Sequence, residues 1–111
     1  MNITEHRQGG AVVLRPAGAI TGADADRLGQ RLAGVLEGSG VRVVVDMARV
    51  TLLDSRALEV LVEATEKLIR GGKALILVSA NDVVREVLEL TDVASLFEQY
   101  DDLDAAMGSR A

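Results

Sequence analysis

The sequence has no cysteine and no tryptophan, and only one proline, one histidine, one tyrosine and one phenylalanine among its 111 residues. The absence of cysteine excludes disulfides and thiolate metal sites. Because aromatic residues make up 2% of the chain and hydrophobic residues 49%, the core must be built from Val, Leu, Ile and Ala. This composition favours a layered α/β packing, in which β-branched strands meet leucine-rich helices.

Clusters of basic residues are also missing, and the net charge is −5 at pH 7. Nucleic acids and anionic membranes both require concentrated Lys and Arg, so neither is an expected partner. The first ten residues lack the apolar run of a signal peptide, and no stretch is long and apolar enough to span a bilayer. We therefore expect a cytoplasmic protein without direct membrane insertion.

The length fits one domain, expected to occupy residues 1–111 with a frayed end after about residue 108. Apolar runs alternate with segments of helical periodicity and predict the order ββαβαβαβα. The expected strands are 3–7, 11–16, 41–46, 74–78 and 96–100. This order predicts an α/β fold with a mixed sheet of four or five strands and helices packed on it, because strands that alternate with helices pair in parallel and the first two form a hairpin.

Two details of the first half carry specific expectations. Pro16 is expected at a strand end or on an edge strand, because proline has no N–H to donate to a neighbouring strand. Residues 17–22 are expected to be a loop, and Thr21 with Asp24 resembles a capping box for the helix that follows.

The most informative segment is VVVDMARVTLLDSRALEVLV, residues 43–62. An apolar strand ends at Asp46, a short link follows, and Asp54-Ser55 opens an amphipathic helix expected to reach about residue 69. This position exposes Ser55 at a helix N-terminus beside a carboxylate, where free N–H groups can hold an oxyanion or a phosphate. A modification of Ser55 would therefore change the local charge sharply. By residue chemistry alone, an ordinary helix-start residue is the favoured interpretation of Ser55, because most serines at this position only cap the helix.

Enzymatic alternatives have little support in the sequence. Ser55 has no G-x-S-x-G surroundings, and His6 is the only histidine that a catalytic triad could use. Gly72-Lys73 lacks the spacing of a phosphate-binding P-loop. Asp46 and Asp54 flank one link and could share Mg²⁺, but strand-end and helix-capping roles explain both residues better. We expect no catalytic activity, no cofactor and no metal.

The pattern VVVDMARVTLLDS, then a helix, then GGKALILVSAND, resembles the STAS domain of bacterial anti-sigma-factor antagonists. The resemblance covers nearly the whole chain, and its most specific part is strand, Asp, link and Asp54-Ser55. It implies a mixed sheet with packed helices and a domain that is not an enzyme. It also implies that Ser55 is a phosphorylation site, modified by an anti-sigma factor with serine-kinase activity and restored by a serine phosphatase. The dephosphorylated form would bind the anti-sigma factor and free a sigma factor.

The residues expected to contact the partner are Thr21, Asp54, Ser55, Arg56 and Ala57. The family commonly continues D-S-[ST]-G-L, whereas here Arg56 and Ala57 replace the small polar residue and the glycine. Arg56 can alter docking or pair with a phosphate, and Ala57 adds a methyl group where a partner approaches. Two further interpretations stay open: a constitutive STAS subunit of a transporter or signalling complex, and a binder of a small ligand such as a nucleotide or lipid.

Overall fold

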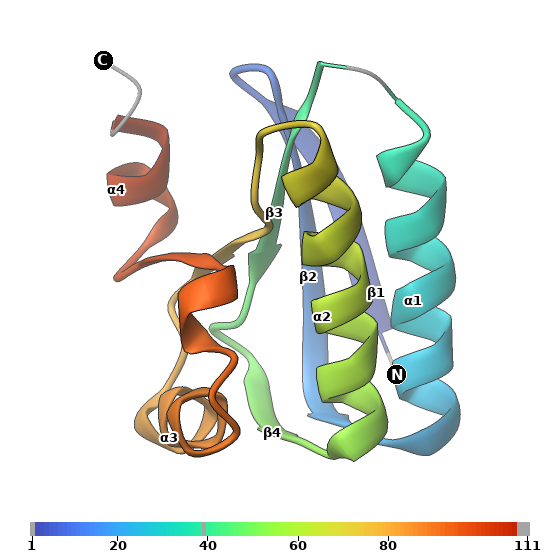
Figure 1. Cartoon of the computed structure of the whole chain (residues 1–111), viewed down its shortest axis with the longest axis vertical. Helices are drawn as coiled ribbons and strands as arrows, with labels where there is room; N and C mark the ends of the chain where they lie inside the picture. Colours follow the sequence, from blue (N-terminus) through green and yellow to red (C-terminus); the bar gives the residue numbers. More distant parts are fainter. Residues whose placement is uncertain (1, 39, 109–111) are drawn as a thin grey trace.

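The computed structural model describes residues 2–38 and 40–108, in which strands and helices alternate as expected (Figure 1). The expected frayed end after about residue 108 lies outside the described residues. The elements are β1 (Asn2–Gln8), β2 (Ala11–Ile20), α1 (Gly22–Leu36), β3 (Arg42–Asp46), β4 (Val50–Leu53), α2 (Ser55–Arg70), β5 (Ile76–Val78), α3 (Asp82–Leu90), a short 3₁₀ helix η1 (Ala94–Leu96), β6 (Glu98–Tyr100) and α4 (Leu103–Gly108).

The strands form one mixed sheet in the order β1-β2-β3-β5-β6, with β4 paired to β2. Only β1 and β2 are antiparallel among the described pairs, and every other pair is parallel. The predicted fold class is therefore confirmed. The sheet has six strands rather than the four or five expected, because part of the expected link between Asp46 and Asp54 forms β4.

Strand β2 is longer than expected and lies inside the sheet, so the prediction of a strand end or edge at Pro16 is wrong. Residues 11–14 of β2 pair with β3, and residues 18–20 pair with β4. Pro16 falls between these two registers, where no β3 or β4 residue is its partner, so its missing N–H costs nothing on that side. Gly18 has φ +96°, and the register of the β2–β4 pairing shifts between Gly18 and Ala19.

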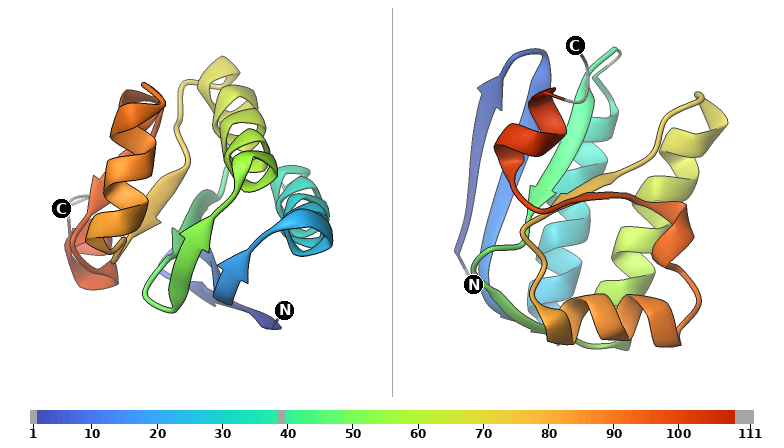
Figure 2. Two further views of the ribbon diagram at one scale, coloured as in Figure 1. Left: turned by 90° about the horizontal axis from the view of Figure 1, so that it is seen from below. Right: turned by 90° about the vertical axis from the view of Figure 1, so that its left-hand side faces the viewer.

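The sheet has a different cover on each face (Figure 2). Helices α1 and α2 pack side by side on one face over the main core, whose members include Leu14, Leu28, Val45, Leu61 and Leu77. Helix α4 covers part of the other face and encloses a smaller cluster, formed by Ala11, Val13, Val44, Ile76, Val78 and Ala106. Aliphatic side chains make up most of both clusters, as the scarcity of aromatic residues requires, and Phe97 is the aromatic member of the main core.

Thr65 is the one buried polar side chain among the described residues, and it links α2 by hydrogen bonds to two other segments of the chain. Its hydroxyl donates to the Leu96 carbonyl at 2.7 Å and accepts the Leu75 N–H at 3.0 Å. Leu75 lies in the segment that connects α2 with β5, and Leu96 is the last residue of η1. The hydroxyl therefore satisfies two backbone groups that have no ladder partner at these positions.

Replacing Thr65 by valine should lower the free energy of unfolding by about 2–3 kcal/mol, because two backbone groups lose their partner while the side-chain shape is kept. Urea unfolding of Thr65→Val and Thr65→Ser measures this. Serine keeps the hydroxyl and loses a methyl group, so Thr65→Ser should be the less damaging change. If serine is as damaging as valine, packing rather than hydrogen bonding explains the residue.

Candidate functional site

The N-termini of α1 and α2 meet at one edge of the sheet. Strand β2 leads into α1 and strand β4 leads into α2, and the two strands lie side by side (Figure 2). Their last residues, Ile20 and Leu53, are partners in register, and the Asp54 N–H donates to the Ile20 carbonyl at 3.2 Å. Because parallel strands end at the same edge, the two helix starts are held at a fixed separation.

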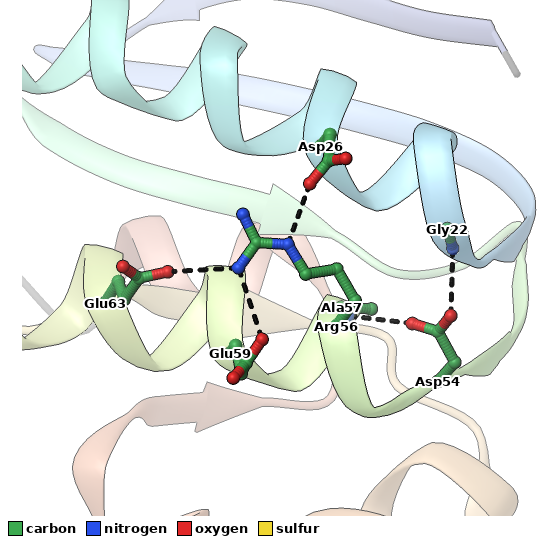
Figure 3. Close-up of polar contacts among 7 residues, drawn as sticks. All are labelled: Gly22, Asp26, Asp54, Arg56, Ala57, Glu59 and Glu63. Carbon is green, nitrogen blue, oxygen red and sulfur yellow. Dashed lines mark hydrogen bonds and ion pairs between the residues drawn. The ribbon is translucent and has the colours of Figure 1, made fainter.

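Asp54 joins these two helix starts through its carboxylate (Figure 3). One oxygen accepts the Ala57 N–H at 2.8 Å, which caps α2, and the other accepts the Gly22 N–H of α1, also at 2.8 Å. The cap was predicted and is confirmed; the bond to Gly22 was not predicted. The Ala57 and Gly22 N–H groups stabilise the charged carboxylate and lower the pKa of Asp54 below its ordinary value.

This lowered pKa predicts a stability change in acid. A carboxylate whose pKa is lower in the folded state stabilises the fold fully above its unfolded pKa of about 4, and that stability is lost as pH falls through the lowered value. In an Asp54→Asn variant the side chain has one oxygen and no charge, so it keeps at most one of the two bonds. Urea unfolding from pH 7 to pH 3 should show a difference in the free energy of unfolding between the wild type and Asp54→Asn, and this difference should become smaller below about pH 4. A difference that stays constant over this range would contradict the link between the Asp54 charge and stability.

Ser55 is the first residue of α2, and its side chain is exposed. Its hydroxyl makes no hydrogen bond within the described part of the chain. The predicted position of Ser55 at the start of a helix, open to solvent, is confirmed. Its role as a phosphorylation site stays a prediction. Because Asp54 provides the cap, the Ser55 hydroxyl is not needed to start the helix.

Thr21 is exposed and precedes α1 as its N-cap residue. Its side chain makes no capping bond, so the Thr21 part of the expected capping box is wrong. The Asp24 N–H donates instead to the Thr21 carbonyl at 2.9 Å, and Asp54 takes the Gly22 N–H. The Thr21 hydroxyl therefore has no capping task and lies at the same edge as Ser55.

Arg56 forms ion pairs with three carboxylates near this edge (Figure 3). Its Nε donates to Asp26 of α1 at 2.7 Å, and a terminal nitrogen lies 3.2 Å from Glu59 and 3.7 Å from Glu63. Hydrogen bonds to Asp26 and Glu59 raise the pKa of the guanidinium further above its ordinary value. The side chain thus bridges the two helices instead of standing free beside Ser55.

Ala57 lies on the buried side of α2, and its side chain is 0% exposed. Its methyl group packs in the main core, so the expectation that it meets a partner is corrected. The third position of α2 faces the sheet, because residues of one helix turn point in different directions around its axis. Ala57 contributes to the site only through the N–H that Asp54 accepts.

Comparison with protein families matches residues 2–106 to the STAS domain. The chain belongs to the STAS-domain family. A Bordetella bronchiseptica protein, BtrV, named as an anti-sigma factor antagonist, is 27% identical over 106 residues, which cover 96% of this STAS chain and 91% of BtrV. The predicted family is confirmed.

Solved STAS structures superpose closely on this chain. The crystal structure of an anti-sigma factor antagonist from Mycobacterium paratuberculosis has a TM-score of 0.87 at 26% identity, over 97% of this chain and 92% of that chain. The anti-sigma factor antagonist SpoIIAA in its unphosphorylated form has a TM-score of 0.79 at 14% identity, over 98% and 96%. SpoIIAA, from Bacillus, is also known in a phosphorylated form, with a TM-score of 0.76 at 12% identity, over 99% of this chain and 100% of that chain. At such low identity, SpoIIAA shows that the fold is shared.

Four residues at this edge of the STAS domain were not predicted from the sequence: Gly22, Asp26, Glu59 and Glu63. Glu59 and Glu63 follow Arg56 by three and seven positions on α2, so helical spacing alone could have found them. Gly22 and Asp26 belong to another helix, and no local pattern relates them to Asp54 or Arg56.

A shared ion site at Asp46 and Asp54 finds no support in the geometry. Asp46 accepts the Ala48 N–H and an Arg15 nitrogen, both at 3.0 Å, and Asp54 is bound to two backbone N–H groups, so neither carboxylate is directed at a shared ion. Within residues 2–38 and 40–108, no group of three or more His, Asp or Glu side chains is placed to hold a metal. No helix in this same part of the STAS domain has the length and apolar character needed to cross a membrane.

Proposed function

We propose that this STAS protein is an anti-sigma-factor antagonist whose binding is controlled by phosphorylation of Ser55. The observation that carries the proposal is the exposed Ser55 hydroxyl at the start of α2, beside a carboxylate that is itself bound to two helix starts. The hydroxyl is open to a kinase and has no structural hydrogen bond to lose. The family membership and the relatives named as antagonists support the same function.

The proposed partner is an anti-sigma factor with serine-kinase activity, and a serine phosphatase would restore the binding form. Such a cycle operates on proteins in the cytoplasm, where sigma factors act. The docking surface would comprise Thr21, Asp54, Ser55 and Arg56, with Ala57 setting the backbone beneath them. These residues sit on helix starts that the paired strands β2 and β4 hold in place, so a partner would meet a preformed surface.

The switch itself is electrostatic. A phosphate adds about 1.5 to 2 negative charges at neutral pH to a surface that already carries Asp54. The helix N-terminus offsets part of this charge. A partner surface shaped for a neutral hydroxyl would then face both a larger group and a repelling or poorly solvated charge. The dephosphorylated form is therefore the binding form.

Incubation with candidate anti-sigma kinases and Mg-ATP, followed by intact mass measurement, tests the proposal. The wild type should gain the mass of one phosphate, Ser55→Ala should gain none, and Ser95→Ala should behave as the wild type, because Ser95 is an exposed serine of η1 away from the α2 start. A phosphate that appears on Ser55→Ala, or a protein that none of the kinases modifies, would favour a constitutive STAS subunit instead.

A further inference from the structure

Arg56 stands next to Ser55 in the chain, but its guanidinium is held elsewhere. Nε lies 2.7 Å from Asp26 on α1, and one terminal nitrogen lies 3.2 Å from Glu59 and 3.7 Å from Glu63 on α2. In Figure 3 the guanidinium lies among these three carboxylates, and the Asp54 carboxylate lies on the opposite side of the Arg56 backbone, directed at Gly22. We call Asp26, Glu59 and Glu63 the Arg56 cage.

Helix geometry separates the two neighbours. Successive residues of an α-helix point about 100° apart, so side chains at positions i and i+1 do not face each other. Arg56 shares its face of α2 with Glu59 and Glu63, toward α1. The two helices are close on this side: a Cβ atom on Gly29 of α1 would lie 3.2 Å from Val60 Cγ2. The Arg56 side chain thus bridges the groove between the two helices rather than reaching into the solvent around Ser55.

Charge balance keeps the guanidinium in the cage. Three carboxylates surround one cation, and Arg56 is roughly half exposed at 47%, so the site is stabilised by several charges at once instead of one isolated pair. If Arg56 left to pair with a phosphate on Ser55, three acidic groups would remain together without a counter-charge. Moving the cation therefore gives up its attraction to three carboxylates for an attraction to one phosphate.

We propose that Arg56 is a positioning residue that braces α1 against α2 and stays in its cage when Ser55 carries a phosphate, so that the Arg56 guanidinium does not neutralise that phosphate. This inference rests on the proposed function, because it concerns the same serine. It explains how the long charged residue that replaces a small one after Asp54-Ser55 is compatible with a charge-operated switch. The phosphate would then face the partner without an ion pair to Arg56.

Phosphoserine installed at position 55 during synthesis, by an expanded genetic code, tests this without any kinase. Phosphorus NMR then gives the second pKa of the phosphate in the phosphorylated wild type and in the Arg56→Gln and Arg70→Gln proteins. Arg70 lies at the other end of α2 with no described ion pair and serves as the matched control. An ion pair would lower the phosphate pKa by about 1 unit or more, whereas screened charges at a distance change it by less than about 0.3 unit. We expect Arg56→Gln to change the phosphate pKa by less than about 0.3 unit. A rise of the phosphate pKa by about 1 unit would overturn the proposal.

Neutralising the three carboxylates tests whether the Arg56 cage holds the guanidinium. In a protein with Asp26→Asn, Glu59→Gln and Glu63→Gln, the freed guanidinium should reach the phosphate, and adding Arg56→Gln in this background should now raise the phosphate pKa by about 1 unit. The comparison is made within one background, so the lost acidic charges cancel. No rise would show that the cage is not what restrains Arg56. Failure of kinases to modify Ser55 would reject the proposed function and leave this result standing, because the phosphoserine is incorporated during translation without a kinase.

Discussion

Replacing Val44 by aspartate is expected to remove a large part of the free energy of unfolding of the domain in buffer at room temperature. Val44 is 0% exposed and lies in the centre of the sheet, in register with Val13 of β2 and Ile76 of β5. A carboxylate there would be buried among aliphatic side chains without a hydrogen-bond partner or a counter-charge. The expected loss is at least about 4 kcal/mol, a large part of the roughly 5–15 kcal/mol that holds a typical domain folded.

The matched control makes the same substitution on the surface. Val83 is 57% exposed in the first turn of α3, where an acidic side chain also favours the helix N-terminus. Circular dichroism and urea unfolding should find Val83→Asp as stable as the wild type to within about 0.5 kcal/mol. A folded Val44→Asp protein with near-normal stability would mean that the α4 side of the sheet is open to water, contrary to the packing described above.

Ser55→Asp should weaken binding to the anti-sigma partner by about tenfold or more, which corresponds to about 1.4 kcal/mol. The substitution places a second carboxylate beside Asp54 on the surface proposed to dock, and it has less charge than a phosphate, so the true phosphoprotein should bind more weakly still. Ser55→Ala should bind as the wild type does. Its fold should be unchanged, because Asp54 supplies the α2 cap.

Ser95→Asp is the control for total charge, since it adds the same negative charge to an exposed serine of η1. Calorimetric titration of the partner should give equal affinities for the wild type, Ser55→Ala and Ser95→Asp. If Ser55→Asp binds the partner with the same affinity as these three proteins, the serine is not a switch. A constitutive STAS subunit then becomes the better description. If Ser95→Asp weakens binding as much as Ser55→Asp, the effect is one of overall charge instead of position.

The fold class could be predicted because the decisive signals are local. Apolar runs, helical periodicity and the glycine pairs that end them are properties of neighbouring residues, and the alternation of strands with helices leaves few topologies. The strand β4 and the full length of β2 were not predictable in this way. Residues 18–20 and 50–53 become strands by pairing with each other, and neither has a strong strand pattern alone.

The contacts of the candidate site also fall into those predictable from neighbouring residues and those that depend on packing. The sequence determined that Asp54 caps a helix and that Ser55 follows it in the open, because a cap and the first turn it serves are adjacent in the chain. The tertiary structure alone decided that Asp54 also binds Gly22, 32 residues away, and that Asp26 holds Arg56. Both contacts exist because the parallel pairing of β2 with β4 brings two helix starts to one edge of the sheet. A contact between side chains and backbone of different helices depends on that packing and leaves no periodic trace in the sequence.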